Sequence, residues 1–146
     1  MRRASILVAC LAIFVSLAAP AHAGLDAFMA DLNVRARSDM RDFSLKLAAQ
    51  FGVGDAEVQA ILGATSSPAD AFMCLQLGQM AHRPSGVVLE AMTTEKGKGW
   101  GVIAQRLGIK PGSAEFKALK KGNFALTGKP HGPGDKAKGK SYKNKK

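Results

Sequence analysis

Residues 67–81 read SPADAFMCLQLGQMA, and this stretch indicates how the 146-residue chain folds. Ser67 can cap a helix by accepting a hydrogen bond from its first turn, and Pro68 suits the first helical position, where its missing N–H is not needed. Elsewhere apolar residues also recur every three or four positions, and no segment alternates apolar and polar residues as a half-buried strand does. The sequence therefore predicts an all-α fold with one helix from Pro68 to about Ala81. The residues expected to face inward on this helix are Met73, Leu77, Met80 and Ala81.

Shorter helices are expected on both sides of this segment, because glycine and proline residues separate the other apolar-periodic stretches. A composition of 47% apolar and 22% charged residues fits one small globular domain. We therefore expect a small bundle of short helices. The first expected helices are 25–32 with a continuation to 37, a helix that Ser38 or Asp39 can cap and that runs to about 51, and 55–63. Further helices are expected at 84–92 and 100–107, and a last helix contains Phe116 and Leu119 and ends at Gly122.

Two parts of the chain resemble each other and indicate an internal repeat. Leu47–Val53 matches Ile103–Ile109 at an offset of 56, and Gly54–Ile61 matches Gly112–Leu119 at an offset of 58, after a two-residue insertion. Each copy predicts two helices joined by a glycine turn, which is a helix-turn-helix-like hairpin. We expect both hairpins to pack against a central helix pair within 69–92.

The first hairpin follows the residue spacing of DNA-binding helix-turn-helix units, but that spacing reports packing geometry more directly than DNA contact. Its second helix carries Asp55 and Glu57, whose charges would repel phosphate. The second hairpin has a longer turn and offers Lys117, Lys120 and Lys121. We expect no sequence-specific DNA binding.

Residues 1–23 have the pattern of a secretory signal peptide. An arginine pair at 2–3 is followed by an apolar run at 6–19 and by an A-x-A pattern, with alanine at 21 and 23, before Gly24. The apolar run would form a helix of roughly 21 Å, shorter than the ~30 Å hydrocarbon core of a bilayer. The sequence thus predicts export, with the mature protein periplasmic or secreted.

Most of the positive charge of the mature chain lies at its C-terminal end. Without residues 1–23, 19 Lys or Arg residues stand against 11 Asp or Glu residues, a net charge of +8. Residues 128–146 contain seven lysines and Asp135, which leaves a net charge of only +2 for the expected helical domain, 24–127. The Gly/Pro/Lys composition of 128–146 predicts a disordered tail. The tail could contact an anionic polymer or a membrane surface, or it could serve only for solubility.

Residues 97–122 read GKGWGVIAQRLGIKPGSAEFKALKKG. Together with SPADAFM at 67–73, this stretch resembles a group of small exported bacterial proteins of uncharacterised function that carry the motif GKGWGxIAxxLGIKPGSxEFxxLKxG. The resemblance covers most of the mature body. It implies no activity, cofactor or catalytic residue.

A glycine-rich turn precedes the helix expected from Trp100. Gly97, Gly99 and Gly101, flanked by two lysines, could hold a phosphate or sulfate at the start of that helix. No strand and no Gly-Lys-Ser/Thr signature accompany them, so a nucleotide site is not expected. Alternatively, the glycines only allow the chain to turn while Trp100 anchors the next helix. The candidate anion-binding or partner-binding residues of the chain are Lys96, Lys98, Gly99, Trp100, Lys117, Lys120 and Lys121.

Metal binding and catalysis have little support in the sequence. Met73, Cys74, Met80 and His82 are soft ligand types that suit copper, but Cys74 and His82 would lie about 12 Å apart along one helix. Cys74 is the only cysteine after residue 23, and its apolar neighbours favour burial. No nucleophile, base and orienting group are grouped together. We expect no catalytic activity, no metal and no cofactor.

Two functional hypotheses follow. In the first, the protein binds an unidentified envelope protein or other partner through its helical body. In the alternative, it binds anionic polymers or nucleic acid through residues 128–146 and the second hairpin. A structural or stress-related role without a dedicated ligand also remains open.

Overall fold

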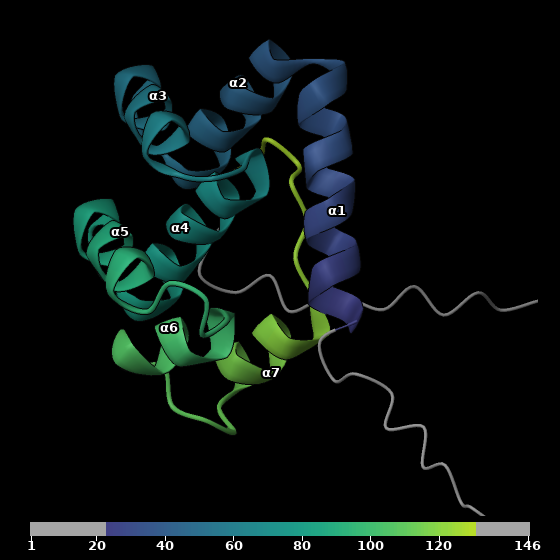
Figure 1. The fold of residues 1–146 in the computed structure, drawn as a ribbon. Coiled ribbons are helices and arrows are strands. Elements are labelled where there is room, and N and C mark those ends of the chain that lie inside the picture. Colours follow the sequence, from purple (N-terminus) through teal and green to yellow (C-terminus); the bar gives the residue numbers. More distant parts are fainter. Residues whose placement is uncertain (1–22, 131–146) are drawn as a thin grey trace, which may run out of the picture.

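The computed structural model describes residues 23–130, and within this range it contains seven helices and no strand (Figure 1). This result confirms the all-α prediction. The predicted signal peptide, apart from its last residue, and residues 131–146 of the predicted tail lie outside the described residues. The helices are α1 (Ala23–Ser38), α2 (Met40–Phe51), α3 (Asp55–Ala64), α4 (Pro68–Ala81), α5 (Ser85–Thr94), α6 (Trp100–Arg106) and α7 (Ala114–Lys121).

Helix α4 is the centre of the molecule and contacts α1, α2, α3 and α5. It begins as predicted, because the Ser67 hydroxyl accepts a hydrogen bond from the Asp70 N–H at 3.2 Å and Pro68 is the first helical residue. Met73 and Leu77 are buried as predicted, but burial extends all round this part of the helix. All eight residues from Ala71 to Gly78 are buried, since neighbouring helices surround this part of α4. Met80 and Ala81, by contrast, are only partly buried.

Helix α1 runs without interruption to Ser38 and stands along one side of the bundle, where it contacts α2, α4 and α7 (Figure 1). The next helix starts at the predicted cap: the Asp39 carboxylate accepts a hydrogen bond from the Asp42 N–H at 2.9 Å. Gly52 ends α2 in the left-handed region, with φ of 66°. The polar cap at Asp39, with extended backbone between the two helices, explains why α1 and α2 form a corner and not one long helix. Gly52 in turn separates α2 from α3.

The pairs α2–α3 and α6–α7 form the two predicted hairpins. Both first helices end with an equivalent backbone hydrogen bond, from Val53 to the Ala48 carbonyl at 3.2 Å and from Ile109 to the Ala104 carbonyl at 3.0 Å. Helices α2 and α3 pack on α4, as expected. In the second hairpin only α6 follows the expectation, by packing on α5, while α7 packs on α1. The close approach of α7 to α1 depends on Gly122, where a Cβ atom would collide with the backbone of Gly24.

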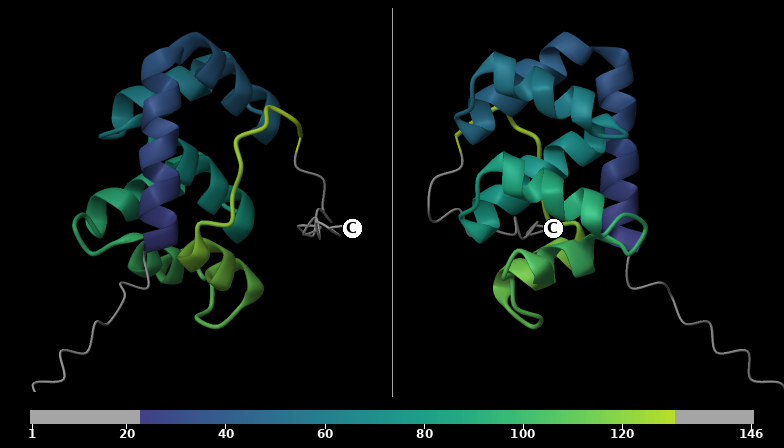
Figure 2. Two further views of the ribbon diagram at one scale, coloured as in Figure 1. Left: turned by 90° about the vertical axis from the view of Figure 1, so that its right-hand side faces the viewer. Right: turned by 60° about the vertical axis from the view of Figure 1, so that its left-hand side comes forward.

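Residues 123–130 form a non-helical segment, here called the C-terminal strap, which runs from α7 back to α2 (Figure 2). Leu126 of the strap is buried. The Phe124 ring lies 5.9 Å from the Phe28 ring, which in turn packs edge-on against Phe72 at 5.2 Å. The strap therefore completes the aromatic core between α1 and α4.

Gln50 of α2 fixes the far end of the C-terminal strap. Its side-chain Nε2 donates a hydrogen bond to the Ala125 carbonyl at 2.9 Å. Its Oε1 accepts hydrogen bonds from the Thr127 N–H at 2.8 Å and from the Gly128 N–H at 3.3 Å. This side chain is buried, and its donor and acceptor satisfy strap backbone groups that have no helical partner.

No helix within residues 23–130 combines the length and the apolar composition that crossing a bilayer requires.

Candidate functional site

The charges of the described residues are separated along the chain. Residues 23–94 contain five Lys or Arg residues and eight Asp or Glu residues, a net charge of −3. Residues 95–130 contain eight Lys or Arg residues and only two acidic residues, a net charge of +6. The α6–α7 hairpin therefore forms a cationic unit on a body whose remaining helices are weakly acidic.

Helix α7 is built so that one face is apolar and the other is cationic. The Ser113 hydroxyl caps its start by accepting a hydrogen bond from the Phe116 N–H at 3.1 Å, and Gly122 ends it with φ of 62°. Phe116 and Leu119 are buried against the core. The spacing of three residues between them leaves the opposite side of the helix in solvent.

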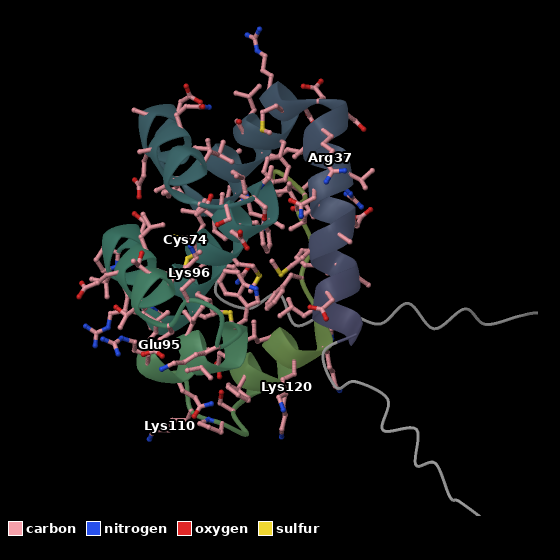
Figure 3. All side chains as sticks on the ribbon, viewed as in Figure 1. Arg37, Cys74, Glu95, Lys96, Lys110 and Lys120 are labelled. Atoms are coloured by element: carbon pink, nitrogen blue, oxygen red, sulfur yellow. The ribbon has the colours of Figure 1, made fainter. Side chains whose placement is uncertain are left out.

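Lys117, Lys120 and Lys121 are exposed and lie at positions i, i+3 and i+4, which share one side of the helix. Within residues 23–130, none of the three forms a salt bridge. The Lys120 ammonium group lies 5.8 Å from the centre of the Phe116 ring, a weak cation–π contact. Lys110 and Lys120 both point away from the body at the α6–α7 end, while Arg37 lies at the opposite end (Figure 3). We call Lys117, Lys120 and Lys121 the lysine face.

The other basic residues of this hairpin include two that are already neutralised. The Glu95 side chain, in a residue only 8% exposed, accepts hydrogen bonds from Lys98 Nζ and from an Arg106 guanidinium nitrogen, both at 2.9 Å. The hydrogen bond from Lys98 is the main reason that the pKa of the Glu95 carboxyl lies below its ordinary value, and Arg106 adds to this effect while burial opposes it. Lys98 therefore already forms an ion pair with a carboxylate of the protein itself.

The glycine-rich turn contains four of the candidate residues, which are Lys96, Lys98, Gly99 and Trp100. They are neighbours along the chain and do not form one cluster with the lysine face. Gly99, with φ of 86°, precedes α6, and the Trp100 side chain packs against the core at the first helical position. Lys96 is exposed beside this turn, nearer to α5 than Lys110 or Lys120 are (Figure 3). The arrangement fits the alternative in which the glycines allow a turn and Trp100 anchors the next helix.

Cys74 is fully buried, as predicted. Its Sγ lies 3.7 Å from the Ser85 carbonyl oxygen, and burial together with the negative charge of Glu57 raises the pKa of the thiol to about 12. Cys74 and His82 line one cavity of about 320 Å³. Across residues 23–130, no three His, Cys, Asp or Glu side chains are grouped so that they could hold a metal ion.

The sequence-based reasoning missed Glu95 and Arg106. The pair Glu95–Lys98 has the i, i+3 spacing of a helical ion pair and was therefore a detectable signal. Arg106 is eleven positions from Glu95, and only the packing of α6 on α5 brings them together. The strap contacts of Gln50 were likewise not visible, because they join positions more than seventy residues apart.

The sequence matches no protein-family model and no curated protein, and no solved structure matches the chain.

Proposed function

We propose that this protein is an exported binding protein of the bacterial envelope that attaches to phosphate-bearing anionic surfaces through the α6–α7 hairpin. The observation that carries the proposal is the lysine face, with Lys117, Lys120 and Lys121 exposed on one side of α7. The proposal requires no catalytic activity and no cofactor.

The lysine face groups three cations on one helix, and none of the three has a carboxylate partner among the described residues. Four other basic side chains of this part of the chain are paired. Arg35 pairs with Asp31, Lys46 pairs with Asp42, and Lys98 and Arg106 share Glu95. Ammonium groups without such partners can bind phosphate without first breaking an ion pair. Each lysine near an anionic membrane surface contributes about 1 kcal/mol of attraction.

Residues 131–146 add six lysines and Asp135 to the chain. Their charge can increase the affinity for the same surface, because a second cationic segment on one molecule binds at a high effective concentration. The strap ends near α2, so this segment is attached to the molecule away from α7 (Figure 2). The lysine face and residues 131–146 are therefore separable in an experiment.

Vesicles that contain phosphatidylglycerol test the proposal at low salt. The triple variant K117Q/K120Q/K121Q should bind roughly a hundredfold more weakly than the unaltered protein. The matched control R35Q/R37Q/R41Q removes the same charge from α1 and α2 and should change the affinity much less. If both triple variants lose the same affinity, net charge alone drives binding and the lysine face has no special role.

Nucleic-acid binding through the same face is a second candidate, because the lysine face lies on the second helix of a helix-turn-helix-like hairpin. Duplex DNA then competes with vesicles for the protein. This candidate predicts that DNA binds more tightly than vesicles of equal phosphate concentration and that its affinity falls steeply with salt. Tighter binding to vesicles would reject it in favour of a lipid or polymer surface.

A further inference from the structure

A cavity of about 320 Å³ lies beside the first hairpin, away from the lysine face. Its walls come from the end of α2 and the turn after it, from α3 and α4, and from the turn that leads into α5. Its volume falls near the lower limit of small-molecule sites, which span roughly 300–1,000 Å³. Its apolar side is formed by Phe51, Val53 and Leu75.

The turn that closes this cavity is locked in one backbone conformation. The Arg83 N–H donates a hydrogen bond to the Gly78 carbonyl at 2.9 Å, and His82 adopts the left-handed region with φ of 53°. A Cβ at position 78 would lie only 2.9 Å from the Arg83 carbonyl oxygen, so glycine is required there. A non-glycine residue at positive φ persists only where the surroundings hold it. The rim of the cavity is thus formed before any ligand arrives.

Opposite charges line the cavity without pairing with each other. Glu57 of α3 accepts a hydrogen bond from the Ser85 hydroxyl at 2.7 Å through Oε1. Arg83 lines the same cavity, and no salt bridge within 4 Å joins it to Glu57 or to any other carboxylate of residues 23–130. Both side chains belong to exposed residues, so each remains available at the rim.

We propose that this cavity binds a small zwitterion, an α-amino acid with an aliphatic side chain. The ligand's ammonium group would bind the Glu57 carboxylate, and its carboxylate would bind the Arg83 guanidinium group, whose planar fork suits a carboxylate. Its aliphatic part would pack on the apolar side formed by Phe51, Val53 and Leu75. A ligand with only one of the two charges leaves one of these rim groups without a partner.

Titration calorimetry with three related probes tests this inference. L-Leucine carries both charges, 4-methylpentanoate lacks the ammonium group, and 3-methylbutylamine lacks the carboxylate. Leucine should bind saturably, and each of the other two compounds should bind at least about tenfold more weakly. If leucine shows no saturable binding at about 10 mM, where even a weak site would fill, or if a singly charged probe binds equally well, the inference is wrong.

Variants of the rim residues provide the second test. E57Q keeps the shape and an oxygen for the Ser85 hydroxyl but removes the charge, and R83Q removes the opposite charge. Each should weaken leucine binding at least about tenfold, while E90Q and R41Q, which alter charges away from the cavity, should not. Circular dichroism verifies that each variant is folded. Unchanged affinity in E57Q and R83Q would overturn the inference, whereas the K117Q/K120Q/K121Q variant should bind leucine normally whether or not the lysine face binds anions.

Discussion

Glu95 joins three segments of the chain through one carboxylate. It lies just after α5, receives a hydrogen bond from Lys98 in the glycine-rich turn and a second from Arg106 in α6. Because the residue is nearly buried, loss of its charge would leave two cations without a partner. The carboxylate therefore stabilises the turn that positions the cationic hairpin.

The pH dependence of unfolding tests this role. The pKa of Glu95 lies below its ordinary value of 4.5 in the folded protein, so its ionised form stabilises the fold above the unfolded pKa. This contribution is lost as the pH falls through the lowered, folded pKa. The difference in unfolding free energy between the unaltered protein and E95Q should therefore be largest above the ordinary pKa of 4.5 and shrink as the pH falls below it.

Urea unfolding at several pH values measures this difference. The control is E90Q, because Glu90 is exposed and forms no salt bridge within residues 23–130. The difference for E95Q should change with pH by more than the difference for E90Q does. Equal changes for the two variants would contradict the proposed pairing.

Helix boundaries were the most predictable feature of the fold, because short-range chemistry sets them. The caps at Ser67 and Asp39 and the terminal glycines at 52 and 122 fix α2, α4 and α7 close to the expected ranges. The burial of α4 on all sides depends on where the neighbouring helices pack. The spacing of apolar residues along the sequence does not state directly which helices become neighbours. The placement of α7 on α1 was missed for the same reason.

In the candidate site, too, the local sequence predicted some features, while others depend on how the helices pack. Periodicity placed Lys117, Lys120 and Lys121 on one helix, and α7 presents them together. The neutralisation of Lys98 was not predictable, because it depends on Arg106 and on a buried Glu95. Nor could spacing along the chain place Glu57 and Arg83 at one cavity.

Two glycines at helix ends offer a matched test of the packing between α1 and α7. Gly52 and Gly122 have nearly equal φ values, 66° and 62°. A Cβ at Gly52 would meet no atom within 4 Å, whereas one at Gly122 would collide with the backbone of Gly24 and Leu25. G52A should therefore lower the unfolding free energy by roughly 1 kcal/mol, and G122A by roughly 2–4 kcal/mol.

Urea denaturation of both variants gives the two values. Equal destabilisation would mean that backbone conformation alone matters at Gly122 and that α7 does not pack closely on the start of α1.

The molecule as a whole is held together by the C-terminal strap as well as by its helices. Leu126 and Phe124 add apolar contacts, and Gln50 holds the strap backbone through three hydrogen bonds. A chain that ends at Gly122 should lose roughly 4 kcal/mol of stability, since apolar area becomes exposed and the buried Gln50 amide loses its partners.

A chain that ends at Pro130 is the control, because it retains every described strap contact. It should unfold at nearly the same urea concentration as a chain that continues to Lys146. If both shortened chains are equally stable, the strap contributes nothing to the fold.

The strap also determines when the body can become stable as the chain is made. Gln50 meets partners that follow it by 75 to 78 positions, and contacts between such distant residues form late, after the local helices. A ribosome delivers a polypeptide from its N-terminus. A nascent chain therefore cannot complete the packing around Gln50 until residue 128 has emerged.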